Sequence, residues 1–314
     1  GGVSTGFQLA LRARSPFGPY EAKKVLAQGN TPVNGPHQGA WVHTKYGEDW
    51  FVHFQDKGPY GRVVHLQPLT WKDNWPVIGR VPQRGYCGTP YLSYRKPKSE
   101  SRLIVTPQES DSFNLPRLGR QWQWQANYNP SFGMPTSLGF FRLYTYKTND
   151  NFWNVPNLLL QKTPADCFTV TAKFTLISKA EGQLGGLIMM GLDYSSLVVK
   201  RVGDGFVLQQ MTCRNADKGG AVIVTPLAHL AKTGQDDNDY QFAIYEEVFL
   251  QMKVDGGIVR FAFSRDGKHF KEVGEPFKMR EGKWIGAKMG FVAQEPNVKS
   301  NRGWIDIDWF NVTD

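Results

Sequence analysis

The sequence predicts an all-β protein, and three observations support this. Aromatic residues make up 13% of the 314 residues and occur together with 33 Gly and 19 Pro, a composition typical of turn-rich globular proteins. Short runs rich in β-branched and aromatic residues recur along the chain, separated by Gly, Pro, Asn and Asp turns. Leu250, Met252 and Val254 alternate with Gln251 and Lys253, which indicates a sheet with one buried and one solvated face.

The first part of the chain is predicted to be antiparallel sheet with long irregular connections. Strand-like runs are separated by turn sequences such as NTPVNGP and DKGPYG, and they occupy residues 7–12, 40–44, 50–54 and 62–66. We assign this part to a first domain over residues 1–95. Residues 96–111 are polar and contain proline near both ends, so we expect a linker that includes one short strand.

The second part, residues 112–314, is predicted to be a two-sheet β-sandwich. Strand-like runs follow one another closely at 168–176, 185–192 and 196–202, and 248–273 contains three more. The turns between these last three contain Asp255-Gly256-Gly257 and Arg265-Asp266-Gly267, sequences whose glycines favour hairpin turns. A sandwich of two sheets accounts for this number of strands.

Composition excludes several classes of function. The net charge of +9 is spread along the chain, because residues 1–111 carry 14 basic and 8 acidic side chains and the rest carry 23 and 20. No basic run alternates with aromatic residues, so we expect no nucleic-acid partner. No apolar stretch approaches the roughly 18 residues of a membrane helix, so we expect no membrane partner. Cys87, Cys167 and Cys213 have neither disulfide nor zinc-site spacing.

Several segments resemble glycoside hydrolase family 43, and they keep the family's order along the whole chain. They include GGVSTGFQLALRARSPFGPYE (1–21), NGPHQGAWV (34–42), GEDWFVHFQDKGPYGRVVHLQPLTW (47–71), DNWPVIG (73–79), QWQWQANYNP (121–130), WIGAKMGFVA (284–293) and GWIDIDWF (303–310). The resemblance is to the β-xylosidase and α-arabinofuranosidase type with a C-terminal concanavalin A-like β-sandwich. It implies that residues 1–95 are the C-terminal blades of a five-bladed β-propeller, and therefore a partial propeller.

The resemblance implies an inverting glycosidase that cleaves xylosyl or arabinofuranosyl linkages in plant cell-wall polysaccharide, with xylo- or arabino-oligosaccharides as substrates. The family's three catalytic carboxylates lie upstream of a position such as Gly1, which together with the missing initiator Met predicts an N-terminal truncation. We therefore expect no catalytic residue in this chain, and no activity from the chain alone. The resemblance implies no required cofactor and favours an extracellular or periplasmic location.

Three residues are the candidates for substrate contact. Arg62 in GPYGRVVHLQP matches the position of a family arginine that contacts substrate hydroxyls, a role that suits the fixed fork of a guanidinium. His37 and Gln38 in NGPHQGAWV both match a channel histidine that holds a metal ion or an ordered water, depending on how the motif is aligned. A structural Ca²⁺ at His37 or Gln38 is the metal that this match suggests, although one imidazole or amide is a weak calcium ligand.

The carboxylates of the chain give no clear catalytic pair. The acids of the first domain occupy turns, where carboxylates are normally solvated: Glu21, Glu48, Asp49, Asp56 and Asp73. Asp306 and Asp308 alternate on one predicted strand, which separates them by about 6.6–6.8 Å. That separation fits an inverting pair, but two side chains on one strand point the same way instead of flanking a bond. The resemblance implies that they lie on a structural closing strand of the sandwich, and we interpret the pair as a solvent-facing pair or a structural cation site.

Aromatic residues leave an alternative open. Stacking on sugar rings is one role for Trp41, Trp50 and Phe54, but we expect core packing for each. We also expect Trp122 and Trp124 to pack between the sheets. The alternative to a hydrolase is a non-catalytic carbohydrate-binding or structural β-sandwich module, for which residues 128–136 are a candidate loop and homo-oligomer formation a further role.

Overall fold

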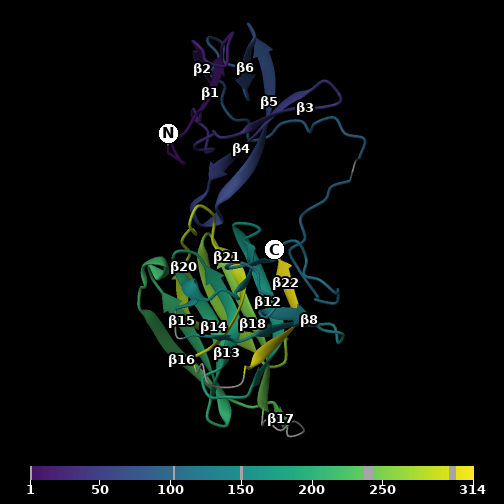
Figure 1. Ribbon diagram of the computed structural model, residues 1–314, viewed down its shortest axis with the longest axis vertical. Coiled ribbons are helices and arrows are strands. Elements are labelled where there is room, and N and C mark those ends of the chain that lie inside the picture. Colours follow the sequence, from purple (N-terminus) through teal and green to yellow (C-terminus); the bar gives the residue numbers. More distant parts are fainter. Residues whose placement is uncertain (1, 102, 149–150, 237–242, 297–301) are drawn as a thin grey trace. The chain divides into compact units, whose positions relative to one another are not determined.

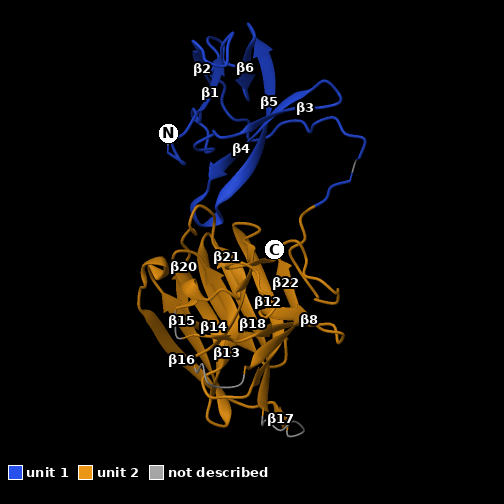
Figure 2. Ribbon diagram, in the orientation of Figure 1, with its two compact units in different colours: residues 1–105 blue, residues 106–314 orange. Residues whose placement is uncertain are grey.

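The computed structural model describes all residues except 1, 102, 149–150, 237–242 and 297–301. The described chain forms two compact units, residues 1–105 (unit 1) and residues 106–314 (unit 2) (Figure 2). Both consist almost entirely of strands joined by turns and loops (Figure 1). No helix among the described residues is long and apolar enough to cross a membrane.

Unit 1 contains a two-stranded hairpin and a four-stranded antiparallel sheet. The hairpin pairs β1 with β2, and the sheet has the order β3-β4-β5-β6. The bounds are Gln8–Arg12 (β1), Glu21–Leu26 (β2), Ala40–His43 (β3), Asp49–Asp56 (β4), Arg62–Lys72 (β5) and Trp75–Ile78 (β6), with the short 3-10 helix η1 at Gly58–Tyr60. A single blade-like sheet and one hairpin do not by themselves establish the predicted propeller.

The core of unit 1 lies between the hairpin and one face of the sheet. Val25 and Leu26 of β2 pack with Phe51, Leu69 and Ile78 of the sheet. The opposite face of the sheet carries the exposed side chains of Val42, Val64 and Leu66. The sheet therefore buries one face within unit 1 and leaves apolar side chains on the other.

Unit 2 is a sandwich of two eight-stranded sheets. One sheet has the order β16-β15-β14-β13-β21-β11-β7, with β10 paired to β21, and the other has the order β20-β19-β18-β12-β22-β9-β8, with β17 paired to β18. The bounds in the first sheet are Gln123–Trp124 (β7), Tyr146–Lys147 (β10), Leu159–Lys162 (β11), Leu184–Met190 (β13), Tyr194–Val202 (β14), Gly205–Cys213 (β15), Val222–Ala231 (β16) and Lys288–Glu295 (β21). Those in the second are Gly133–Pro135 (β8), Phe141–Tyr144 (β9), Cys167–Ser178 (β12), Gly234–Asp236 (β17), Ala243–Asp255 (β18), Ile258–Ser264 (β19), Lys271–Lys278 (β20) and Trp304–Thr313 (β22).

Aromatic side chains fill the space between the two sheets. Phe291 of β21 makes edge contacts with Phe174 of β12 and Phe310 of β22, at ring-centroid distances of 6.3 and 5.6 Å. Trp122 is buried against Phe310 at 5.1 Å, so its predicted place in the core is confirmed. A second apolar cluster lies on the other face of the first sheet, where Phe152 and Val155 are part of it.

The predicted strand within residues 96–111 is wrong. Its only apolar run, Leu103, Ile104 and Val105, forms no strand, and Ile104 is 81% exposed. A strand needs a partner that accepts and donates its backbone hydrogen bonds, and the described residues offer none beside this run. The segment is irregular chain up to its last residue, Asp111, which forms an isolated antiparallel bridge with Phe310 of β22.

Candidate functional site

Two of the three predicted contact residues of unit 1 lie against one aromatic ring. The guanidinium carbon of Arg62 lies 4.7 Å from the ring centroid of Phe54, and the imidazole of His37 lies 5.5 Å from the same ring. All three side chains are half-buried. Because Asp56 of β4 pairs with Arg62 of β5, Phe54 and Arg62 are diagonal neighbours on one face of the sheet.

The loop before β3 fixes the His37 ring. Its Nδ1 atom lies 2.6 Å from the carbonyl oxygen of Gly35, and since a carbonyl only accepts, Nδ1 carries the proton. In the tautomer that this contact selects, Nε2 is the acceptor for a ligand. Gly6 packs so close to the ring that a Cβ there would lie 2.3 Å from Nδ1, so a larger residue at position 6 would displace the imidazole.

Gln38 differs from His37 in its surroundings. Its side chain is exposed, and its backbone has a φ of 52°, an uncommon left-handed conformation for a residue other than glycine. The described residues contain no group of three or more His, Cys, Asp or Glu side chains that could hold a metal ion. One imidazole and one amide do not make a calcium site by themselves, so the chain's own residues do not fit the suggested Ca²⁺.

The carboxylate of Asp49 is fixed by three donors at the other end of the sheet. It accepts hydrogen bonds from the indoles of Trp41 and Trp71 at 2.8 and 2.9 Å, and its Oδ1 lies 2.8 Å from Nδ1 of His43. The His43 contact lowers the pKa of Asp49, and the two indoles add to this against the effect of burial. The carboxylate is therefore ionised and engaged. Trp41 itself is 56% exposed, so its predicted place in the core is wrong.

Glu48 is likewise engaged within unit 1. It accepts from the backbone N–H of Lys98 at 2.8 Å and from Arg95 at 2.6 Å, and these contacts lower its pKa. Trp50 adds a longer bond from its indole at 3.3 Å, and its ring is buried as predicted. Through these hydrogen bonds Glu48 holds residues 95–98 against the sheet of unit 1.

A stack of three rings follows the middle of the sheet. His53 lies between Phe51 and His65, at centroid distances of 6.3 and 5.4 Å. Burial lowers the pKa of His53 to about 4, so the ring is neutral at pH 7. Its Nε2 atom is buried without a hydrogen-bond partner. Sequence alone shows only that His53 lies on a strand-like run, and the stack with His65 appears once β4 and β5 are in register.

The aspartates of β22 are held by cations of unit 2. Arg142 donates two hydrogen bonds of 2.8 Å to Asp306, and Lys173 lies 2.9 Å from Asp308. The register between β12 and β22 shifts at Lys173, which breaks the simple alternation expected between these aspartates. Both are thus parts of ion pairs, in agreement with a structural role.

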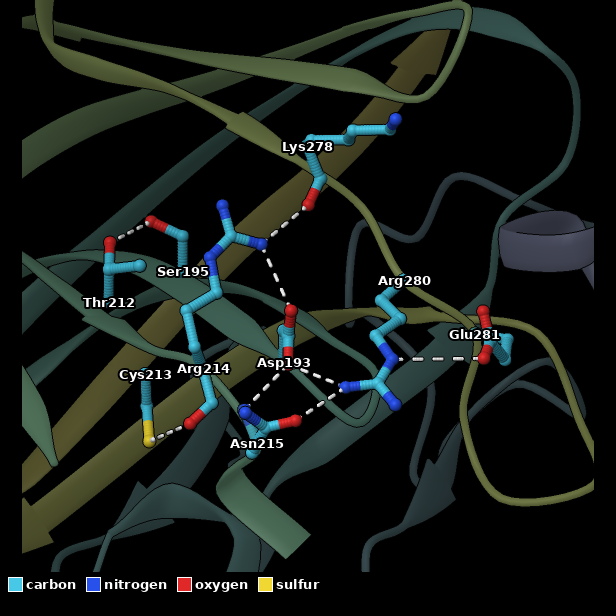
Figure 3. A network of polar contacts seen from close by, with 9 residues as sticks. All are labelled: Asp193, Ser195, Thr212, Cys213, Arg214, Asn215, Lys278, Arg280 and Glu281. Carbon is cyan, nitrogen blue, oxygen red and sulfur yellow. Dashed lines mark hydrogen bonds and ion pairs between the residues drawn. The ribbon is translucent and has the colours of Figure 1, made fainter. Parts of the chain in front are cut away.

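A further polar network joins three loops of unit 2 around Asp193 (Figure 3). The carboxylate accepts from the Asn215 N–H at 2.7 Å, from Arg214 at 3.0 Å and from Arg280 at 3.2 Å. Burial alone would raise the pKa of Asp193, but these three donors outweigh it and the pKa is lowered. The network holds the loop that follows β20, which carries Trp284 with 71% of its surface exposed.

Two family models match the chain in the order of its two units. Residues 110–313 match the model described as "Beta xylosidase C-terminal Concanavalin A-like domain". Residues 2–76 match the model described as "Glycosyl hydrolases family 43". The chain belongs to glycoside hydrolase family 43. The predicted family, the glycosidase class and the concanavalin A-like sandwich are therefore confirmed.

Two relatives in sequence are named as beta-xylosidases. A protein of Xylanibacter ruminicola named as a beta-xylosidase is 34% identical over 296 residues, which cover 92% of this chain and 51% of that protein. A beta-xylosidase of Formosa agariphila is 30% identical, over 96% of this chain and 52% of its own length. The chain thus spans about half the length of these curated relatives.

Among solved structures, a family 43 protein of Bacillus licheniformis superposes with a TM-score of 0.79 at 21% identity, covering 98% of this chain and 60% of that one. A xylan beta-1,4-xylosidase of Bacillus halodurans gives a TM-score of 0.77 at 18% identity, over 97% of this chain and 59% of that one. At these identities the similarity establishes the fold alone. Arg62, His37 and Gln38 remain predictions as substrate contacts.

Proposed function

We propose that this family 43 chain is part of a hydrolase that releases xylosyl or arabinofuranosyl units from plant cell-wall polysaccharide with inversion at the anomeric carbon. The observation that carries this proposal is that His37 and Arg62 both contact the ring of Phe54. The two relatives named as beta-xylosidases support the choice of sugar. The substrate is then a xylo- or arabino-oligosaccharide.

In this proposal Arg62 binds hydroxyl groups of the terminal sugar. Its guanidinium lies over the Phe54 ring, which restricts the side chain and keeps the planar group in a fixed orientation. A hydroxyl pair on a pentose can accept from that fork at low conformational cost. His37 contributes Nε2 as an acceptor, because its Nδ1 proton is committed to Gly35.

The same proposal places the bond-cleaving carboxylates outside these 314 residues. Inversion needs two carboxyls about 6.5–9.5 Å apart, one of them kept protonated. Glu48 and Asp49 have lowered pKa values, so neither suits a general acid. In unit 2 burial raises the pKa of Glu295, but that side chain is fully buried and accepts from Gln183 and Thr145, out of reach of a substrate.

A second candidate function is carbohydrate binding by unit 2 without turnover. Its support is the exposure of two aromatic side chains on loops, Tyr128 within the expected segment 128–136 and Trp284. Exposed rings of this kind stack on sugar faces. Under this alternative unit 2 binds oligosaccharide in every form of the protein, and no form releases sugar.

Stereochemistry tests the proposed reaction. The chain would be extended upstream of residue 1 through the rest of a family 43 propeller and mixed with xylobiose or an arabinofuranosyl oligosaccharide, and the first product anomer would be followed by proton NMR. The proposal expects the inverted anomer to appear first and then mutarotate. Release of the retained anomer would overturn inversion, and no release from either sugar would favour the binding function.

A further inference from the structure

The amide of Asn34 takes the place of a neighbouring strand at the end of β4. Strand β3 pairs with β4 only from Ala40, which lies opposite Val52, whereas β5 pairs with β4 up to Asp56. The backbone of Asp56 bonds instead to a side chain. Oδ1 of Asn34 accepts from the Asp56 N–H, and Nδ2 of Asn34 donates to the Asp56 carbonyl oxygen, both at 2.9 Å. These two bonds satisfy the groups that a paired strand would otherwise satisfy.

This pair of bonds connects the segments that carry the candidate contact residues. Asn34 lies three residues before His37, and Asp56 pairs with Arg62 across β4 and β5. The rings of His37 and Phe54 lie 5.5 Å apart, and the guanidinium carbon of Arg62 lies 4.7 Å from the Phe54 ring. The Asn34 amide therefore joins the loop that carries His37 to the two strands that carry Phe54 and Arg62.

The chain between Asn34 and His37 has little freedom to rotate. Gly35 is buried and has a φ of 49°, a left-handed conformation that glycine adopts without steric cost. A Cβ at this position would collide with the carbonyl oxygen of Val3, so the segment before β1 packs closely against the loop. Pro36 is also buried, and its ring fixes its own φ. The position of Asn34 is therefore transmitted to His37.

We propose that Asn34 is a positioning residue for the substrate site, which holds the imidazole of His37 against Phe54 so that Nε2 can accept from a sugar hydroxyl. The inference rests on the proposed function, because it needs His37 as a substrate contact. Asn34 acts through His37 and contacts no substrate itself, since Asp56 engages both ends of its amide. A group held in place before the substrate arrives binds it at a lower entropic cost.

Nuclear Overhauser contacts between the rings of His37 and Phe54 test this role in the chain itself. Histidine and phenylalanine would be labelled selectively, and His37 would be assigned by the signals that are missing in His37→Ala. We expect the ring contact in the unaltered protein and its loss in Asn34→Ala. Gln67→Ala is the matched control, because Gln67 also holds a backbone by both ends of its amide: it donates to the Tyr91 carbonyl oxygen at 3.1 Å and accepts from the Tyr91 N–H at 2.7 Å. The control should keep the contact.

Two results of this measurement would overturn the inference. One is an unchanged contact between His37 and Phe54 in Asn34→Ala. The other is an equal loss in Gln67→Ala, because the contact would then respond to any destabilisation of unit 1. If Asn34→Ala does not fold, Asn34→Asp decides. Its carboxylate has the same shape and still accepts from the Asp56 N–H, but it cannot donate to the carbonyl oxygen, so the ring contact should weaken there as well.

Kinetics of the protein extended upstream of residue 1 separate this inference from the proposed function. Asn34→Ala should lower kcat/KM for nitrophenyl β-xyloside about tenfold or more, since a misplacement of about 1 Å can cost about a hundredfold in rate. The same substitution should have no further effect in a His37→Ala background, because Asn34 acts through His37. Full additivity of the two substitutions would overturn the positioning role. No turnover by the unaltered extended protein would overturn the proposed function alone, and the ring contact would still decide whether Asn34 positions His37.

Discussion

Arg62 lies over the ring of Phe54, with its guanidinium carbon 4.7 Å from the ring centroid. The two residues come from neighbouring strands, β4 and β5, whose register places Asp56 opposite Arg62. The contact converts a flexible arginine into a restrained one next to the imidazole of His37. Unit 1 thereby presents a cation and an imidazole acceptor around one aromatic ring.

Replacing Arg62 by Ala should weaken substrate binding in a catalytically competent form of the protein. Loss of a charge-assisted contact to sugar hydroxyls costs roughly 1.5–3 kcal/mol, so kcat/KM should fall about tenfold to a hundredfold. Steady-state kinetics with nitrophenyl β-xyloside measures this, with Arg84→Ala as the control. A kcat/KM within twofold of the unaltered protein would remove Arg62 from the substrate site.

The buried His53 should make unit 1 sensitive to acid. Its pKa is about 4 in the folded state and ordinarily 6.5, so the unfolded chain binds the proton first as the pH falls. The stability is complete above pH 6.5 and declines between 6.5 and 4. His53→Phe keeps the stack with Phe51 and His65 but removes the titration and the unpaired Nε2. We expect its thermal unfolding midpoint to depend less on pH across this window, and equal slopes would contradict the assignment.

Asp193→Asn should destabilise unit 2. The buried carboxylate accepts hydrogen bonds from Asn215, Arg214 and Arg280. Losing its charge should lower the free energy of unfolding by on the order of 2 kcal/mol, or the midpoint of thermal unfolding by several degrees. Asp204→Asn removes an exposed partner of Lys232 and should cost below about 1 kcal/mol. Because the pKa of Asp193 is lowered in the folded protein, its ionised carboxylate stabilises the fold above the usual aspartate pKa of 3.8. This stabilisation is lost as the pH falls below that value.

The segment between the units should be the first site of proteolysis. Leu103, Ile104 and Val105 are exposed, at 82%, 81% and 82%, and belong to no strand. Thermolysin prefers to cut before such residues, and irregular exposed chain is readily cleaved. Brief digestion followed by mass spectrometry should give a fragment that begins at one of these residues. Initial cleavage inside β12 or β18 would contradict the two-unit organisation.

Local patterns in the sequence were sufficient to predict many of the strands. The hairpins at Asp255-Gly256-Gly257 and Arg265-Asp266-Gly267 are present between β18, β19 and β20, as predicted. β2 and β16 have weaker patterns. β2 reads EAKKVL, with three charged residues in its first four positions, and β16 contains Pro226 at an irregular register against β15. Edge strands tolerate such residues because one side of the strand is unpaired.

The candidate site was only partly predictable. The sequence motifs single out His37 and Arg62, but the role of Phe54 as their shared contact depends on a loop and two strands that meet only in the folded chain. The expected core position of Trp41 is wrong because its indole turns to Asp49 of the neighbouring strand instead. Both differences arise from contacts between segments distant in sequence, which periodicity alone does not contain.

The most direct test of the account is hydrolysis of nitrophenyl β-xyloside and nitrophenyl α-arabinofuranoside by this exact chain, beside the same chain extended upstream through the rest of a family 43 propeller. The account predicts that only the extended protein releases nitrophenol, because it proposes substrate contacts at Arg62 and His37 and an acid and base pair outside these residues. Comparable activity from the 314 residues alone would contradict it and would place the catalytic carboxylates within this chain.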